Sequence, residues 1–187
     1  MNYTCVAIKN TFMELLKEKP LDKISVKEIT EKCQINRNTF YYHYHDTYDL
    51  LQKIFEEEAE KYATPYLDND MEWKDCFIQA VGFALENKEA ICHVFNSMQR
   101  STLEKYLFDV SGSLMASIIK KKSEGLDISA IDKKYMTIVY KHAIVGIIIE
   151  WLGNDMQDDP YTVIDRMSKI FNGSIEFILQ RLHDTKE

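Results

Sequence analysis

The stretch Ile35-Asn-Arg-Asn-Thr-Phe-Tyr-Tyr-His-Tyr44 follows Ser25-Val-Lys-Glu28 after a short interval, and together they predict two short helices joined by a turn. Ser25 and Asn36 are residue types that begin helices, because their side-chain oxygens accept hydrogen bonds from the first unpaired backbone N–H groups. The first helix is expected to end near Cys33 and the second to begin at Asn36. This arrangement is typical of a helix-turn-helix unit.

The second of these helices carries long hydrogen-bonding side chains on most of its surface. Only Phe40 is expected to point inward, and Tyr44, which follows the helix, is also assigned to the core. A helix with so many polar side chains is suited to lie against a polar partner, and in a helix-turn-helix unit that partner is the major groove of DNA. The alternative is a solvated helix face whose aromatic side chains pack on the next helix.

Composition favours a helical, cytoplasmic protein. The 187 residues are 45% hydrophobic and 28% charged, and only six glycines and three prolines are available for turns, so an all-α fold is expected. No secretory signal pattern is present at the N-terminus, and the longest apolar run, residues 143–149, is too short to span a membrane. The four cysteines are scattered, which is typical of reduced thiols and not of a metal site or a disulfide framework.

The net charge of −7 is unevenly distributed along the chain. Residues 1–54 hold eight basic and seven acidic residues, whereas residues 55–187 hold fifteen and twenty-three. Because the N-terminal segment is nearly neutral and the acidic residues lie elsewhere, much of the objection to a nucleic-acid partner is removed. Counterion release from one copy would still be modest, so two copies on one DNA site are expected.

Hydrophobic periodicity extends the helical prediction over the whole chain. Over residues 4–18, Cys5, Ile8, Phe12 and Leu15 recur at helical spacing. In the helix that begins at Ser25, Glu28 is expected to complete a capping box with that serine. The expected helices are 4–18, 25–33, 36–43, 48 to Pro65, 71–87, 88–98, 101–124, 129–153 and 160 to about 183.

The order of these features resembles the N-terminal domain of TetR-family transcriptional regulators. The pattern covers roughly residues 4–55 and includes Ile29 of the capped helix, the turn, Asn36 and the aromatic run that follows it. The stretch Gly146-Ile-Ile-Ile-Glu-Trp151 also resembles a TetR subgroup that includes regulators of dihydroxyacetone-kinase operons. The resemblance implies a DNA-binding domain over residues 1–46 and a larger helical ligand-binding and dimerisation domain over residues 47–187.

The resemblance places DNA contacts on both helices of the unit. The chemistry agrees, because a guanidinium can bind guanine O6 and N7 together, an amide can read adenine, and phenol or imidazole groups can donate to phosphate oxygens. Each good base contact would discriminate by about 1–3 kcal/mol. The family's base contacts fall on Lys27, Arg37, Asn38, Thr39 and Tyr41, and its phosphate contacts on Tyr41, Tyr42 and His43.

Two positions depart from the family's pattern. The family usually has a phosphate-binding lysine at the start of the fourth helix, where this chain has Thr47. It usually has glycine in the turn, where this chain has Gln34, a residue that tolerates a positive φ poorly. Loss of the lysine would flatten the salt dependence of binding by about 0.9 in slope, although His45 could partly substitute when protonated.

The helix expected over residues 129–153 is apolar on every face from Ala143 to Ile149, so both of its sides must be buried. One side can pack within its own chain and the other against a second copy. The last helix offers a broad apolar stripe, in which Gly173 would permit close approach. A two-fold bundle of these two helices from each copy, usual in the family, would place two reading helices about 34 Å apart. An ordinary buried core helix is the alternative.

The resemblance also implies an effector pocket among the central helices of the C-terminal domain. The side chains there suit a mostly apolar molecule, although each residue taken alone is more often core packing than a ligand contact. Glu150 could pair with a cation of a second copy, hold a polar group of the ligand, or point to water. The candidate lining residues are Phe77, Val81, Phe95, Met98, Tyr106, Met115, Tyr140 and Trp151, with His93 and His142 as possible polar contacts.

No nucleophile, acid–base pair, Gly-rich phosphate loop or metal-ligand cluster is recognisable, so neither catalysis nor a cofactor is expected. The sequence predicts a homodimeric, ligand-responsive repressor that binds a pseudo-palindromic operator in double-stranded DNA. The rival interpretation is an adaptor of the same fold that binds a small molecule or a protein, with DNA affinity that is weak or supplied by a partner. Thr47, Gln34 and the near-neutral N-terminal segment favour the adaptor, and the polar helix counts against it.

Overall fold

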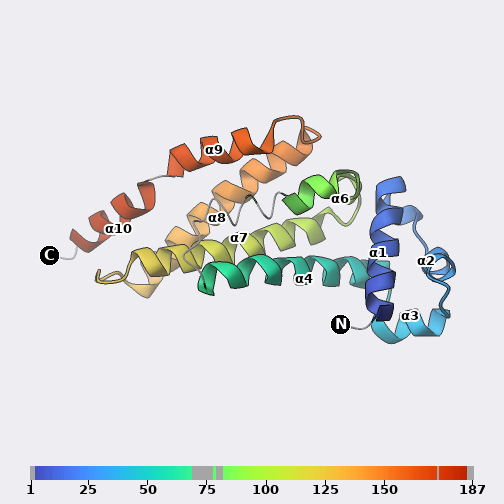
Figure 1. Ribbon diagram of the computed structural model, residues 1–187. Helices are drawn as coiled ribbons and strands as arrows, with labels where there is room; N and C mark the ends of the chain where they lie inside the picture. The colour runs from blue at the N-terminus through green and yellow to red at the C-terminus, as the bar shows by residue number, and fades with distance from the viewer. Residues whose placement is uncertain (1–2, 69–77, 79–81, 172, 185–187) are drawn as a thin grey trace. The chain divides into compact units, whose positions relative to one another are not determined.

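Helices form all the regular structure in the part of the chain that the computed structural model describes, which is residues 3–68, 78, 82–171 and 173–184 (Figure 1). The prediction of an all-α protein is therefore confirmed. The helices are α1 (Tyr3–Glu18), the short 3-10 helix η1 (Leu21–Lys23), α2 (Val26–Lys32), α3 (Arg37–His43), α4 (Thr47–Asp68), α6 (Lys88–Phe95), α7 (Arg100–Lys122), α8 (Ala130–Gly153), α9 (Pro160–Phe171) and α10 (Ser174–Asp184).

The chain divides into two compact units. The N-terminal unit comprises residues 1–60 and 83–106, and the C-terminal unit comprises residues 61–82 and 107–187. Residues 82–86 are helical and end the segment in which a helix over 71–87 was expected, but most of that segment lies outside the described residues. Each unit has its own set of buried apolar side chains and is described separately below.

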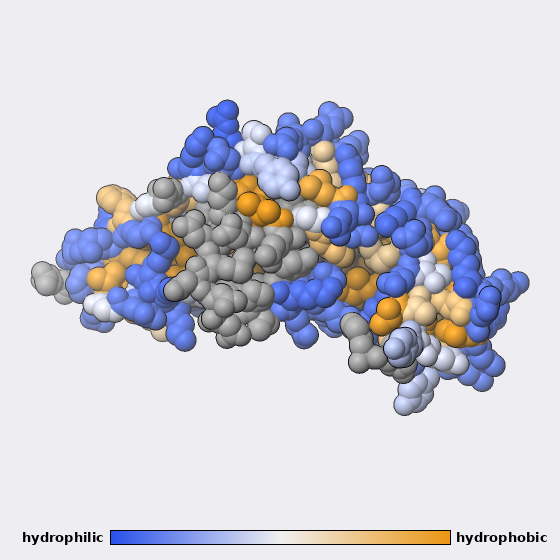
Figure 2. All heavy atoms as spheres, viewed as in Figure 1, coloured by the Kyte–Doolittle hydropathy of each residue, from blue (hydrophilic) through white to orange (hydrophobic). Residues whose placement is uncertain are grey.

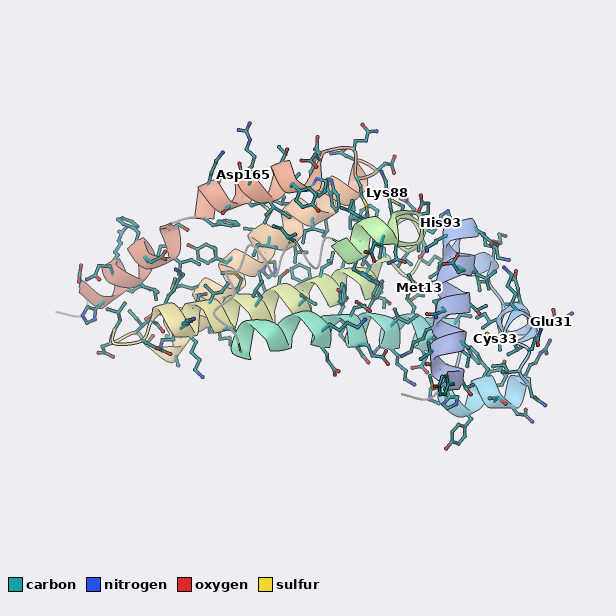
Figure 3. The ribbon with its side chains drawn as sticks, viewed as in Figure 1. Met13, Glu31, Cys33, Lys88, His93 and Asp165 are labelled. Atoms are coloured by element: carbon teal, nitrogen blue, oxygen red, sulfur yellow. The ribbon has the colours of Figure 1, made fainter. Side chains whose placement is uncertain are left out.

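The core of the N-terminal unit is built on α1. Ile8, Phe12 and Leu15 are fully buried at the helical spacing that the sequence predicted, and Phe40 of α3 is fully buried as well. Burial of each such side chain stabilises the fold by about 1.5–3 kcal/mol. The imidazole Nδ1 of His93 on α6 lies 2.6 Å from a backbone carbonyl of α1, and Figure 3 shows this side chain beside α1. Ile29 of α2 is fully buried as well, so α1, α2 and α3 all contribute side chains to this core.

Side-chain caps begin α2 and α3 as predicted. The Ser25 hydroxyl accepts a hydrogen bond from the Glu28 N–H (3.2 Å), and the Asn36 side chain accepts one from the Asn38 N–H (2.9 Å). The expected capping box is only half formed, because the Glu28 carboxylate accepts hydrogen bonds from the Lys19 ammonium at 2.6 Å. A full charge on the partner makes that ion pair the stronger interaction for a carboxylate than a backbone N–H.

The turn between α2 and α3 passes through the left-handed region at Gln34, where φ is 54°. Two hydrogen bonds close it: the Ile35 N–H donates to the Thr30 carbonyl (3.0 Å) and the Gln34 N–H donates to the Glu31 carbonyl (3.2 Å). This pair of bonds is a Schellman motif, in which glycine is the usual left-handed residue. The φ at this position is positive, which is the condition under which Gln34 was expected to be tolerated poorly, and a non-glycine residue there is strained by about 1–2 kcal/mol.

Helix α4 continues through Pro65 and ends at Asp68, so the prediction that this proline ends the helix is wrong. Proline lacks a backbone N–H, and its ring crowds the carbonyl four residues earlier, which breaks many helices in their interior. In α4 the proline stands one turn before the end, where the loss of a single hydrogen bond does not prevent the helix from finishing.

The last predicted helix is two helices, because the chain breaks at Gly173 between α9 and α10. Gly173 has a φ of 77°, which no right-handed helix contains. A Cβ atom placed on Gly173 would meet no atom of the same chain within 4 Å, so within one chain this glycine serves the backbone conformation. Beyond the break, the Ser174 hydroxyl donates to the Phe171 carbonyl at 2.8 Å and ties the two ends together.

The C-terminal unit buries side chains from α7, α8, α9 and α10 in one cluster. On the face shown in Figure 2, hydrophilic side chains cover most of the surface and hydrophobic ones gather in separate groups. By length and composition alone, helix α8 is long and apolar enough to cross a membrane, as are the core helices of many globular proteins. The buried cluster is Leu114, Met115, Ile118, Ile119, Ile128, Met136, Tyr140, Ile144, Ile164, Met167, Ile175 and Leu179.

Candidate nucleic-acid interface

Helix α3 is anchored from one side and open on the other. The Phe40 ring is fully buried and lies 5.6 Å (between centroids) from the ring of the buried Tyr44, so these two side chains anchor the helix to the core. Arg37 and Asn38 are exposed on the first turn, and Tyr42 is 84% exposed on the last. Of the candidate DNA contacts on this helix, only Thr39 and His43 are half-buried. The helix therefore presents a continuous polar face with two aromatic side chains.

Lys27 lies on the exposed side of α2, where its ammonium pairs with the Glu31 carboxylate at 3.8 Å. Figure 3 shows Glu31 on the side of α2 that faces away from α1 and Cys33 on the side toward it. The Cys33 thiol contacts the Thr11 hydroxyl at 3.1 Å, which confirms that this residue faces α1. Helix α2 thus has a packed side and a charged side, and Lys27 is on the latter.

His43, the last residue of α3, is held on two sides. Its Nδ1 atom lies 3.5 Å from the Cys5 sulfur of α1, and its ring meets the Tyr42 ring edge-on at 4.9 Å. An imidazole in this position keeps Nε2 for a hydrogen bond to an outside acceptor, such as a phosphate oxygen.

The C-terminal end of α3 is tied to α4 by two residues that the sequence analysis did not single out. The Lys53 ammonium donates to the His43 carbonyl at 2.9 Å and to the Asp49 carboxylate at 3.1 Å. Asp49 accepts a further hydrogen bond from the His45 N–H at 2.8 Å. The i,i+4 spacing of Asp49 and Lys53 was a visible signal of an ion pair, but nothing in the sequence connects that pair to the end of α3.

These contacts perturb two ionisable groups. Burial acts to raise the pKa of Asp49, but the hydrogen bonds from the His45 N–H and the Lys53 ammonium outweigh burial and hold that pKa below its ordinary value. Burial and then the neighbouring Cys5 raise the pKa of Tyr44, which is 4% exposed and so belongs to the core, as predicted. The junction between α3 and α4 therefore contains one stabilised carboxylate and one phenol that stays neutral.

Thr47 begins α4 and is only 9% exposed, so it cannot take the place of the long lysine side chain that usually contacts phosphate there. The backbone around it is capped by Asp46, whose carboxylate accepts hydrogen bonds from the N–H groups of Tyr48 and Asp49 at 2.8 Å. His45, just before, is exposed. Of the three residues 45–47 at the start of α4, only His45 can therefore supply a positive charge.

Most basic side chains of residues 1–54 are paired within the unit. Six of the eight form ion pairs with Asp or Glu, and within the described part of the chain Arg37 and Lys23 form none. Arg37 is therefore the basic residue of α3 whose charge is not compensated by a neighbouring carboxylate. The paired residues are Lys9, Lys17, Lys19, Lys27, Lys32 and Lys53.

The candidate effector residues are distributed over both units. In the N-terminal unit, Phe95 is buried under the Arg100 guanidinium (4.1 Å from the ring centroid), Tyr106 stacks on Phe55 (4.9 Å between centroids), and Met98 is 88% exposed. Phe77 and Val81 lie outside the described residues. His93 is occupied by its backbone contact with α1.

In the C-terminal unit, Trp151 is buried and its indole N–H donates to the Asp158 carbonyl at 2.9 Å. His142 is exposed, with Nδ1 2.8 Å from the Ile138 carbonyl and its ring 4.8 Å from the Phe108 ring. Glu150 is also exposed. Met115 and Tyr140 are the two candidates that the structure brings to one cavity.

That cavity has a volume of about 30 Å³ and lies between α7, α8 and the junction of α9 with α10. It can hold water, which needs about 10–15 Å³, but drug-sized ligands occupy pockets of about 300–1,000 Å³. The Lys122 ammonium binds the Glu176 carboxylate beside it, and this hydrogen bond lowers the pKa of Glu176. The lining residues are Met115, Ile118, Lys122, Tyr140, Ile144, Phe171, Gly173, Ile175 and Glu176.

Two family models match the chain. One, described as the C-terminal region of transcriptional regulators, matches residues 71–173, which is more than half of the chain. The other, described as bacterial regulatory proteins of the tetR family, matches residues 11–54. The second range contains α2 and α3 completely, together with the α3–α4 junction.

A curated relative matches over a shorter segment. The uncharacterized HTH-type transcriptional regulator YxbF of Bacillus subtilis (strain 168) is 30% identical over 53 residues. These residues are 28% of this chain and 14% of that protein, so the likeness covers a small part of the relative's length.

Solved structures match nearly the whole fold. The dihydroxyacetone kinase operon activator DhaS has a TM-score of 0.74 and 19% identity, over 94% of this chain and 97% of that one. The fatty acid degradation regulator FadR of Bacillus halodurans has a TM-score of 0.64 and 12% identity, over 92% and 96%. NalD of Pseudomonas aeruginosa, a repressor of a multidrug efflux pump, has a TM-score of 0.62 and 16% identity, over 91% and 95%.

At such identities the structural likeness shows the fold, while the family models connect the sequence itself to regulators of transcription. In the N-terminal unit, the local features that correspond to this family are the capped α2, the Schellman turn and the polar face of α3. The chain belongs to the TetR family of bacterial transcriptional regulators.

Proposed function

We propose that this TetR-family regulator is a homodimeric repressor that binds a pseudo-palindromic operator through α3 and releases it when a small molecule binds the C-terminal unit. The observation that carries the proposal is the construction of α3, which is held from inside by Phe40 and presents a polar face outward. In a helix-turn-helix unit such a face enters the major groove while the preceding helix crosses the backbone.

The roles of the exposed side chains follow from their chemistry. Arg37 would bind a guanine through O6 and N7, and Asn38 would read an adenine, since both side chains can make two parallel hydrogen bonds to one base edge. Tyr42 and the free Nε2 of His43 would donate to phosphate oxygens, which set the position of the helix in the groove. Thr39 and Tyr41 would complete the base contacts, and Lys27 would reach the groove from α2.

Dimerisation is supported by an apolar stripe on the outside of α8. Ile131, Tyr135 and Val139 follow one another at helical spacing and are 62%, 61% and 63% exposed. The stripe continues through His142 and Gly146, which are exposed at the same spacing. Exposed large apolar side chains in a row mark a protein interface. A second copy is the occupant we propose, since the stripe is complementary to itself.

Self-complementarity comes from the uneven bulk of the stripe. Its first half carries Ile131, Tyr135 and Val139, whereas its second half contains Gly146 and Gly153, which have no side chain. If two copies of α8 pair antiparallel about His142, the bulky half of each lies against the glycine half of the other, and large side chains fill the space that the glycines leave.

Charge supports the same pairing. Lys134 and Glu150 are both exposed and stand eight residues before and after His142, so the antiparallel arrangement brings each lysine near the other copy's glutamate. Phe177 of α10, which is 67% exposed, offers further apolar area on the C-terminal unit. A two-fold dimer of this kind would present two α3 helices to half-sites about 34 Å apart.

The effector would act by shifting an equilibrium between two arrangements of the dimer, only one of which fits the half-site spacing. Met115 and Tyr140, on the wall of the C-terminal cavity, are its best-placed contacts. Because the cavity is small, a larger effector would have to open it, and this rearrangement would couple binding to the dimer. Full release of the operator requires the effector to favour one state by about 5.5 kcal/mol.

A dimeric repressor of this kind would act in the cytoplasm, on double-stranded DNA, without catalysis or a cofactor. The apolar outer face of α8 would then be covered by the second copy, and no membrane partner is needed to account for it.

The rival proposal is an adaptor of the same fold whose DNA binding is weak or depends on a partner. Three observations favour it: Thr47 is buried where a phosphate-binding lysine is usual, Gln34 strains the turn, and six of the eight basic residues of positions 1–54 are paired. With few free charges, counterion release contributes little to affinity.

The deciding experiment is selection of bound sequences from a random duplex library at near-physiological salt with the purified protein alone. The repressor proposal predicts enrichment of a pseudo-palindrome whose half-sites are about one helical turn apart. No enrichment from protein that is folded and dimeric would favour the adaptor.

Two variants then test the reading helix on the selected operator. Arg37→Ala and Tyr41→Phe should each abolish specific binding while the dimer stays intact in sedimentation. Tyr3→Phe, which changes a 94% exposed tyrosine at the start of α1 in the same way, is the matched control and should bind normally. If the α3 variants bind as the wild type does, the assignment of the site is wrong.

A further inference from the structure

Helix α3 has only seven residues, and a helix of this length is not stable by itself in water. Its direction therefore depends on how its two ends are held. The first end is held by the Asn36 cap and by the Schellman turn. At the other end, the last backbone carbonyls have no partner within the helix and must bond to something else.

The Lys53 ammonium supplies that partner for the last residue, by donating to the His43 carbonyl at 2.9 Å. A cation is also favourable at this end because of the helix dipole. The lysine comes from the second turn of α4, so this bond joins the end of the reading helix directly to the next helix of the unit.

Lys53 is itself held in place. Its ammonium donates to the Asp49 carboxylate at 3.1 Å and lies over the Tyr44 ring, 5.1 Å from the centroid. Asp49 also binds the His45 N–H at 2.8 Å. The backbone is thus held on both sides of the buried Tyr44: Lys53 binds the carbonyl of His43 before it, and Asp49 binds the N–H of His45 after it. Two of the three N–H donors of the ammonium are therefore used in hydrogen bonds within the protein.

We propose that Lys53 is a positioning residue that fixes the C-terminal end of α3 for DNA recognition, and that its ammonium remains on the His43 carbonyl when DNA binds. This inference rests on the proposed function. Tyr42 and His43, the phosphate-contacting residues, belong to the last turn of α3, so they move if this end is released. Lys53 therefore acts on affinity through the geometry of those side chains and contributes no ion pair to the DNA.

The test uses the salt dependence of operator binding, which separates positioning from phosphate contact. Lys53→Met keeps an apolar side chain on Tyr44 and removes the charge and the donors. We expect it to weaken operator binding about tenfold and to leave the slope of log K against log salt unchanged. Lys53→Arg, which restores a cationic donor, should recover most of the affinity.

Lys23→Met is the matched control, because Lys23 is an exposed lysine of the same unit and makes no ion pair in the described part of the chain. It should bind the operator within about twofold of the wild type. A slope that falls by about 0.9 in Lys53→Met would mean that Lys53 binds a phosphate, and an unchanged affinity would mean that it has no role; either result overturns the proposal.

Amide hydrogen exchange of the free protein tests the structural part of the proposal without DNA. Lys53→Met should increase exchange at residues 42–46 and leave α1 protected, and unaltered exchange there overturns the proposal. If the wild type selects no duplex, the proposed function fails, and exchange still decides whether Lys53 orders α3. If Lys53→Met does not fold, Asp49→Asn takes its place, since it removes the carboxylate that holds the Lys53 ammonium and should weaken operator binding at constant slope.

Discussion

The Lys27 ammonium lies 3.8 Å from the Glu31 carboxylate on the exposed side of α2. Both side chains are about two-thirds exposed, so the pair is free to separate when another charge approaches. If α2 crosses the DNA backbone as proposed, Glu31 comes close to phosphates together with Lys27. The carboxylate then opposes binding in two ways, since it competes for the ammonium and is itself repelled by the DNA.

Glu31→Gln should therefore strengthen operator binding. Like charges about 4 Å apart that are fully screened by water repel by about 1 kcal/mol, which corresponds to about fivefold in affinity. Fluorescence anisotropy with the selected operator measures the change. Glu14→Gln is the control, because it breaks the ion pair with Lys17 on α1 and should leave affinity unaltered. Equal binding of Glu31→Gln and the wild type would place Glu31 away from the DNA.

Gly146→Leu should dissociate the proposed dimer. A Cβ atom at Gly146 meets no atom within 4 Å, so leucine fits the single chain, but its side chain would project into the space that a second α8 fills. We expect the dimer dissociation constant, measured by sedimentation, to rise about tenfold or more. Gly146→Ala is the matched control: it gains the same helix propensity, about 1 kcal/mol over glycine, with only one methyl group in the interface. A stable dimer of Gly146→Leu would show that this part of α8 faces solvent.

Gln34→Gly should stabilise the protein by about 0.5–1 kcal/mol. Glycine relieves the strain of a φ of 54°, and the greater conformational entropy that it gives the unfolded chain offsets part of this stabilisation. Urea denaturation measures the difference. The same exchange at Gln52, an exposed position inside α4, should destabilise by about 1 kcal/mol. A destabilised Gln34→Gly would mean that the turn does not need a left-handed residue in solution.

The Asp49 contacts predict a dependence of stability on pH. Because the folded-state pKa of Asp49 lies below its ordinary value, the carboxylate stabilises the fold fully above the unfolded-state pKa, about 3.9, and this contribution is lost as the pH falls through the folded-state value. Wild type should therefore exceed Asp49→Asn in unfolding free energy by a constant margin near neutral pH, and the margin should shrink below about pH 4. Urea titrations at several pH values measure it.

Lys53→Met provides the check on this assignment. Since the lysine contributes to the low pKa of Asp49, the stability lost on Asp49→Asn should be smaller in the Lys53→Met background than in the wild type, as a double-mutant cycle would measure. A margin that does not depend on pH, or not on Lys53, would contradict the role given to this ion pair.

The N-terminal helices were predictable because their signals are local. Ser25 and Asn36 cap the helices within two or three residues of themselves, and the spacing of Ile8, Phe12 and Leu15 defines one buried face. The glycine that the family usually has at the position of Gln34 indicated where a positive φ would matter, and φ there is 54°. In these cases the interacting groups lie within one or two turns of each other, so the sequence contains the whole interaction.

The errors fall where distant parts of the chain or backbone conformation decide the outcome. Gly173 was noticed, but its left-handed φ, which divides α9 from α10, has no local signature that separates it from a glycine inside a helix. Pro65 was given its usual role as a terminator, and α4 nevertheless accommodates it. The contact of Lys53 with the His43 carbonyl joins two helices. The effector residues rest on residue type and on the place of the family's pocket, and neither tells which side chains share a cavity.

The internal ion pairs of residues 1–54 also affect how the protein molecules would be distributed between the operator and unrelated DNA sequences. Attachment to random duplex is almost wholly electrostatic, and a chromosome offers on the order of a million or more such sites. A helix-turn-helix unit whose ammonium groups are neutralised by its own carboxylates binds these random sites weakly. Few copies would then be held on unrelated sequence, so a small cellular pool would be enough to occupy the operator, and the remainder would stay free to meet the effector.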